Sequence, residues 1–82
     1  MRLRRPGSRY HRSNAIVYFD EVLDEKYRQT IECIVEGVDG VTDAHFNETQ
    51  QQLMIVDFDP QLTSSDAILN RVRRRHLDAQ LI

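Results

Sequence analysis

The chain has 82 residues, a net charge of −2 and a single cysteine, Cys33. This length fits one domain with a modest core, and one cysteine excludes an intrachain disulfide and is typical of a reduced cytoplasmic compartment. No apolar run approaches the roughly 20 residues of a membrane span and no secretory signal follows the basic N-terminus, so the sequence predicts a soluble cytoplasmic protein.

Residues 1–14 are predicted to form a flexible basic arm. They contain five arginines and no acid, whereas the rest of the chain contains six basic and thirteen acidic side chains. Pro6-Gly7 and two serines leave no periodic pattern there. An acidic body argues against a globular nucleic-acid-binding domain, whose body would carry the positive face. A weak contact of the arm with an anionic membrane or an acidic partner stays open, as does a terminus that only aids solubility.

A strand and a helix are predicted next. Residues 15–20 are rich in β-branched and aromatic side chains, which is typical of a strand. Apolar residues then recur at spacings near 3.6, with Glu32 and Glu36 on the opposite side, and Gly37 followed by Gly40 supplies a left-handed stop. The predicted apolar stripe of this helix is Leu23, Tyr27, Ile31, Ile34, Val35 and Val38.

The second half of the chain predicts two strands, a helix and a last strand. Residues 41–47 and 52–58 are the strands, joined by a polar turn, and Asp59-Pro60 ends the second because proline cannot continue a ladder. Thr63 and Asp66 resemble a capping box at the start of a helix. Its buried stripe is expected to be Ala67 or Ile68, Leu69 and Val72, and residues 78–82 form the last strand.

This order of elements predicts an α+β fold over residues 15–82, a ferredoxin-like βαββαβ open-faced sandwich. Its four-stranded antiparallel sheet would carry two helices on one face. Strand alternation then directs one set of side chains away from the helices, namely Ile16, Tyr18, Leu53 and Ile55. We expect these four to form an apolar patch rimmed by Asp43, His45, Asp57 and Gln80. Such a patch usually marks an interaction surface, although scattered apolar exposure is also ordinary.

Three short motifs carry a family resemblance. The chain reads Val38-Asp-Gly-Val41 before the second strand, Val56-Asp-Phe-Asp-Pro60 at the end of the third, and Leu77-Asp-Ala79 before the last. In this order and spacing they resemble the heavy-metal-associated domain. The resemblance implies soluble metal carriers and the cytosolic domains of metal-transporting P-type ATPases. Their chemistry resides in a Cys-x-x-Cys after the first strand, where two thiolates hold a soft ion.

The resemblance places those two cysteine positions at Asp24 and Tyr27. Neither is a thiol, and the phenol of tyrosine is protonated at neutral pH, so the soft-metal site is predicted to be absent and no cofactor is expected. Cys33 lies two turns into the predicted helix and is expected to be a small buried or half-buried apolar side chain.

A different metal site stays open as an alternative. In this fold the loop before the last strand lies beside the loop before the first helix, so Asp24 and His76 could approach each other and hold a borderline ion such as Zn²⁺. His11 of the arm could add a third ligand. A histidine near a helix end can instead simply interact with the helix dipole.

Other functions of this topology find little support. The acidic stretch of residues 20–24 cannot cradle a phosphate, and no nucleotide-binding motif or activated nucleophile is present. Tyr18 has Leu53 and Ile55 as neighbours rather than the second aromatic residue that base stacking requires. The run Arg73-Arg-Arg-His76 is interpreted as a solvated helix end, with a phosphate clamp as the alternative.

The sequence therefore predicts a non-enzymatic interaction or regulatory module of metal transport or homeostasis. Its partner would be another protein or a second copy, bound through the open sheet face, with no nucleic acid. Two alternatives remain: a metal carrier with an oxygen and nitrogen site at Asp24 and His76, and a basic-arm adaptor for a membrane or a nucleic acid.

Overall fold

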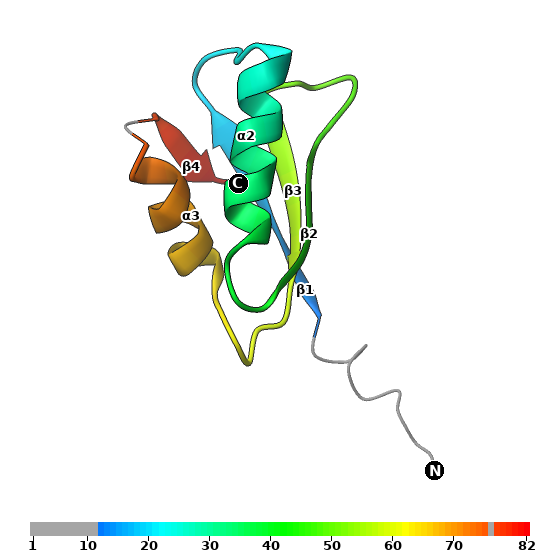
Figure 1. Cartoon of the computed structure of the whole chain (residues 1–82), viewed down its shortest axis with the longest axis vertical. Helices are drawn as coiled ribbons and strands as arrows, with labels where there is room; N and C mark the ends of the chain where they lie inside the picture. Colours follow the sequence, from blue (N-terminus) through cyan, green and yellow to red (C-terminus); the bar gives the residue numbers. More distant parts are fainter. Residues whose placement is uncertain (1–11, 76) are drawn as a thin grey trace.

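The computed structural model describes residues 12–75 and 77–82, and it has the predicted ferredoxin-like βαββαβ fold (Figure 1). The four strands form one antiparallel sheet in the order β2-β3-β1-β4. No helix of the described residues is long and apolar enough to cross a membrane. The elements are β1 (Ser13–Phe19), α2 (Glu25–Glu36), β2 (Val41–Phe46), β3 (Leu53–Phe58), α3 (Ser65–Arg73) and β4 (Ala79–Leu81).

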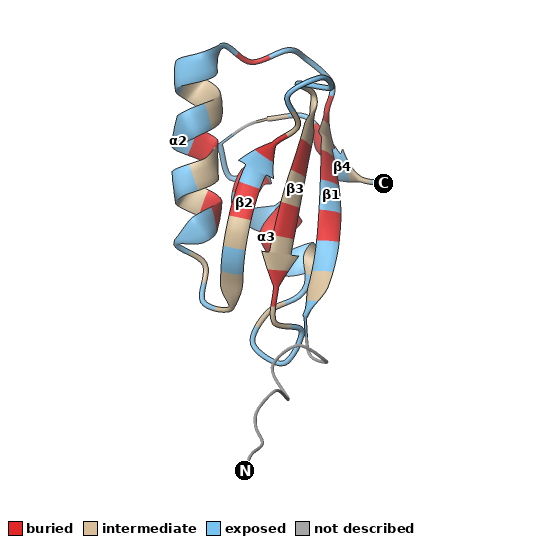
Figure 2. Cartoon of the chain, turned by 90° about the vertical axis from the view of Figure 1, so that its right-hand side faces the viewer, coloured by how far each residue is buried: buried red, intermediate tan, exposed pale blue. Residues whose placement is uncertain are grey.

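Both helices lie on the same side of the sheet (Figures 1 and 2). Helix α2 packs beside β2, and α3 packs against β1 and β4. Burial alternates along β1 and β3, as the period of a strand requires when only one face is covered. The largest fully buried side chains between the layers are Phe19, Ile31, Met54, Ile68, Val17, Val35, Val56 and Val72.

Strand β1 begins at Ser13, two residues before the predicted start. Ser13 and Asn14 pair with Phe58 and Asp57, and the Asn14 side-chain amide donates to Asp57 Oδ1 at 2.6 Å. The expected boundary at residue 15 therefore falls inside the strand, because polar residues extend it along the polar end of β3. Residues 1–11 lie outside the described residues, so the flexible arm stays a prediction.

Both helices begin later than the sequence predicts. Helix α2 is shorter than its apolar stripe, and Leu23 is buried from the preceding loop. Helix α3 is capped by Ser64 instead of Thr63: the Ser64 hydroxyl accepts the N–H of Ala67 at 3.1 Å. With the helix beginning after Ser64, Ala67 is exposed and Ile68 is buried.

Gly40, and not Gly37, supplies the left-handed residue after α2. Gly37 caps the helix with an ordinary helical φ of −77°, whereas Gly40 has a φ of +96°. The Gly40 carbonyl accepts the N–H of Asp59 at 2.7 Å, which joins this turn to the end of β3. A Cβ on Gly40 would lie 2.7 Å from the Cβ of Leu62, so both φ and space require glycine.

We predict that Gly40→Ala destabilises the domain by about 1–3 kcal/mol, through backbone strain and the clash with Leu62. The matched control is Gly37→Ala, which keeps a helical φ and should change stability by less than about 1 kcal/mol. Urea unfolding of the two variants measures both effects. Equal stabilities for the two variants would contradict this account of the turn.

Candidate functional site

The open face of the sheet brings together the four apolar residues predicted to lie there. Ile16 pairs with Ile55, and Tyr18 pairs with Leu53, so the four form two adjacent cross-strand pairs on the central strands β1 and β3. Ile16 is 37% exposed, and the other three are half-buried. Their neighbours along each strand point into the core, as the banded burial of the strands shows (Figure 2).

A fifth apolar side chain extends this face, and it was not predicted. Ile82 is 75% exposed and donates its backbone N–H to the carbonyl of Ile16 at 3.0 Å. Ile82 follows Gln80 by two residues, so the alternation of side chains along β4 could have placed Ile82 on the open face. Around it a groove of about 440 Å³ continues past the edge of β1, lined among others by Ile16, Ile55 and Leu81.

One end of the open face is acidic. Asp43 of β2 stands opposite Asp57 of β3. Asp57 accepts the Asn14 amide and lies 4.0 Å from Arg12 Nη2, while Asp43 Oδ2 lies 2.8 Å from His45 Nδ1. These side chains are a quarter to a half exposed, so the face combines an apolar centre with a polar end of net negative charge.

The β2 edge of the sheet is closed by helix α2. The carboxylate of Glu32 accepts the N–H of Phe46 at 2.8 Å, and that of Glu36 accepts the N–H of Ala44 at 3.4 Å. Both N–H groups point away from β3, and on an uncovered edge they would invite a further strand. Helix α2 therefore closes this edge of the sheet against a further strand. The helix pattern alone, which places Glu32 and Glu36 opposite the core stripe, gives no sign of these bonds.

The positions expected for the two metal-binding thiolates hold a helix cap. Asp24 is the N-cap of α2, and its Oδ1 accepts the backbone N–H of Tyr27 at 2.7 Å. Tyr27 lies in the first turn, half-buried and packed against the core. The carboxylate therefore has a structural role, because it satisfies a backbone donor that the helix leaves free.

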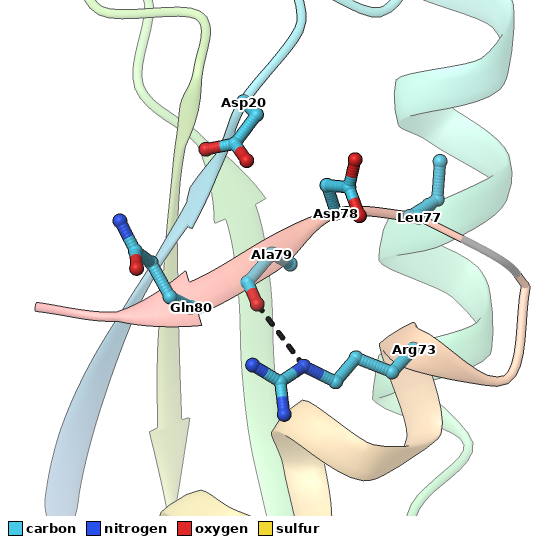
Figure 3. A pocket seen from close by; sticks show the side chains of 6 residues that line it. All are labelled: Asp20, Arg73, Leu77, Asp78, Ala79 and Gln80. Atoms are coloured by element: carbon cyan, nitrogen blue, oxygen red, sulfur yellow. Dashed lines mark hydrogen bonds between the residues drawn. The ribbon is translucent and has the colours of Figure 1, made fainter.

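A hollow of about 560 Å³ lies at the same end of the sheet, where β1 ends and β4 begins (Figure 3). Asp20 and Asp78 carry carboxylates on one side of it, and Arg73 extends from α3 on the other. Arg73 Nε donates to the carbonyl of Ala79 at 3.1 Å. The described lining thus offers hard oxygens and a guanidinium, with no thiol and no imidazole.

The alternative metal site is not brought together by the described residues. His76 and His11 lie outside them, so the pairing of Asp24 with His76 stays a prediction. In residues 12–75 and 77–82 no three histidine, cysteine, aspartate or glutamate side chains are grouped so that they could hold a metal ion. The expectation of a buried or half-buried Cys33 was wrong: it is exposed, because Ile31 and Val35 take the inward positions of α2.

Comparison with known proteins identifies the fold. No protein-family model and no curated protein sequence matches the chain, whereas seventeen chains of known structure do. A copper binding domain from HMA7, a P-type ATPase, has a TM-score of 0.74 and 20% identity, covering 84% of this chain and 92% of its own. Oxidized MerP from Ralstonia metallidurans CH34 has a TM-score of 0.74 and 13% identity, covering 85% and 96%. The CopZ metallochaperone has a TM-score of 0.70 and 16% identity, covering 85% and 100%.

The chain thus has the fold of heavy-metal-associated domains, as its motifs predicted, without a Cys-x-x-Cys. A soft ion such as Cu(I) selects thiolate and thioether ligands. The residues at the corresponding positions are a carboxylate engaged in a cap and a phenol, so they do not fit such an ion.

We predict that Asp24→Cys with Tyr27→Cys creates Cu(I) binding, because the two positions lie at the N-cap and in the first turn of one helix. Loss of the cap should cost about 0.5–2 kcal/mol in the free protein. Competition against a Cu(I) chelator measures the transfer. The unmodified chain should take up no stoichiometric Cu(I), and a tight one-to-one complex that survives Cys33→Ser would contradict this account.

Proposed function

We propose that this chain is a non-enzymatic interaction module with the heavy-metal-associated fold, acting in metal transport or homeostasis through its open sheet face. The observation that carries the proposal is the pair of adjacent cross-strand contacts, Ile16 with Ile55 and Tyr18 with Leu53, on a face that no helix covers. Contiguous, partly exposed apolar surface of this kind is a feature of binding sites.

The residues at the end of the sheet near Asp24 favour partner binding over metal transfer as the function. Asp24 already accepts a backbone N–H, and the nearby hollow presents Arg73 across from two carboxylates. A cationic guanidinium in this hollow disfavours the binding of a metal cation there, because like charges repel. Neither this hollow nor the open face holds a nucleophile paired with a base, so the described residues offer no support for catalysis.

The chemistry of the face selects the kind of partner. An apolar centre and an acidic end match a protein surface with apolar side chains and one or two basic residues at the rim. A second copy matches it less well. In a face-to-face dimer whose two-fold axis runs along the strands, Asp43 and Asp57 would face the same two acids of the other copy. If the axis ran across the strands, the two acids would face Tyr18 and Leu53 of the other copy.

We predict that Ile55→Lys or Tyr18→Glu abolishes partner binding while changing the free energy of unfolding by less than about 1 kcal/mol, since neither side chain is in the core. Phe58→Ala is the matched change on the other face of β3. It should cost about 3–5 kcal/mol by opening a core cavity, and where the protein still folds it should leave the face intact.

The partner can be captured by replacing Tyr18 with a photoreactive phenylalanine analogue in the cells that express the chain. The same analogue at Gln29, exposed on α2, is the control position. A crosslinked product that forms at Tyr18, is absent at Gln29 and disappears with Ile55→Lys supports the proposal. The protein identified in this product, once purified, should bind the unmodified chain and not the Ile55→Lys variant. Identical crosslinked products at both positions would overturn the proposal, and so would products that still form with Ile55→Lys. A product made of two copies of this chain would show self-association in place of a separate partner.

A further inference from the structure

The two edges of the sheet differ in how their outward backbone groups are satisfied. The strand order β2-β3-β1-β4 makes β2 and β4 the edge strands. On β2, two glutamates of α2 accept the N–H groups that point outward. On β4 a helix supplies one bond, from Arg73 Nε to the carbonyl of Ala79 at 3.1 Å (Figure 3). The β4 edge is therefore less protected against a further strand than the β2 edge is.

The register of β4 identifies the backbone groups that point away from β1. The N–H of Ile82 donates to the carbonyl of Ile16 at 3.0 Å. Since alternate residues of an antiparallel strand bond to the same neighbour, residues 78, 80 and 82 bond to β1, and Ala79 and Leu81 turn their N–H and C=O outward. Among residues 12–75 and 77–82, the N–H and C=O of Leu81 have no hydrogen-bond partner.

Two hollows follow one another along this edge. The first, of about 560 Å³, lies against Ala79 and Gln80. The second, of about 440 Å³, lies against Leu81 and Ile82 and reaches Ser65 at the start of α3. A segment of extended chain laid along β4 would occupy both hollows and face the outward groups of Leu81.

The side chains along the edge select the chemistry of such a segment. A further strand has its side chains in register with those of β4 and alternates with the same period. On the open-face side its residues would lie beside Asp78 and Ile82, and on the helix side beside Arg73 and Leu81. Complementary residues are therefore one basic and one apolar on the first side, and one acidic and one apolar on the second. A carboxylate bound to Arg73 would release the Ala79 carbonyl to the incoming strand.

We propose that β4 accepts an extended segment of another protein as a fifth strand of the sheet. The segment would run antiparallel to β4, as the other strands do to their neighbours, because this pairing is the more stable one. Main-chain hydrogen bonds then supply affinity, and the alternating side chains supply specificity. The outward backbone groups of β4 take no part in the open-face contact, so this inference goes beyond the proposed function.

The probe is the peptide acetyl-Ile-Val-Thr-Glu-Lys-amide, which runs from the position opposite Ile82 to the position opposite Asp78. In an NMR titration of the full chain, the peptide should protect the Leu81 amide from hydrogen exchange, because that amide becomes a donor to the new strand. N-methylation of the peptide valine, whose N–H faces β4, should weaken binding on the order of tenfold. N-methylation of the threonine, whose N–H faces away, is the matched control and should change binding less than about twofold.

Charge substitutions in the chain test the register. Asp78→Lys should weaken peptide binding roughly fivefold, and replacing the peptide lysine by glutamate should restore it. Asp39→Lys makes the same charge change at an exposed site in the turn after α2 and should have a smaller effect. Leu53→Lys alters the open face but lines neither hollow, so it should leave peptide binding unchanged. If Asp78→Lys does not fold by circular dichroism, the peptide substitution alone, tested on the unmodified chain, should weaken binding.

Four results would each overturn the proposal. The first is an unprotected Leu81 amide at millimolar peptide, and the second is an equal loss from the two N-methylations. The third is loss of peptide binding with Leu53→Lys, which would place the peptide on the open face. The fourth is protection of the Leu81 amide that rises with protein concentration in the absence of peptide, which would assign this edge to a second copy of the chain.

Discussion

The structure depends on one constraint: two helices cover a four-stranded sheet on one side only. Because side chains alternate along a strand, every residue that builds the core of β1 and β3 is followed by one that cannot reach it. In this chain those outward positions hold isoleucine, tyrosine and leucine at the centre of the sheet and aspartate at one end. The same alternation that buries Val17 and Met54 therefore creates the apolar face that we interpret as a docking surface.

At the start of α2, the two positions expected for metal-binding thiolates stabilise the helix instead. A helix leaves its first N–H groups unsatisfied, and an aspartate at the N-cap accepts one of them. Asp24 does this for Tyr27, and the tyrosine packs against the core in the first turn. Both positions thus stabilise the start of the helix through contacts within the protein.

Local sequence patterns predicted the fold, whereas they did not predict contacts between segments that are distant in the sequence. The alternation of β3 was clear enough to assign both faces correctly, and the two helical stripes identified the buried residues of each helix. The start of β1 was missed because Ser13 and Asn14 are in the strand only through their pairing with Phe58 and Asp57. The Glu32 bond to Phe46 joins a helix to a strand, and no periodicity of either element contains it. The prediction for Cys33 was wrong because the position of a residue on a helix decides its burial more than its hydrophobicity does, and Cys33 lies on the outer side of α2.

The most direct measurement is an NMR titration of the isotope-labelled chain with the captured partner. If the open face is the functional surface, the amides of Ile16, Tyr18, Leu53 and Ile55 should shift most, while those from Leu23 to Tyr27 stay unchanged. Shifts confined to the loop before α2, with the open face silent, would contradict the account. They would return the function to the loop before α2, where the family resemblance places a metal site.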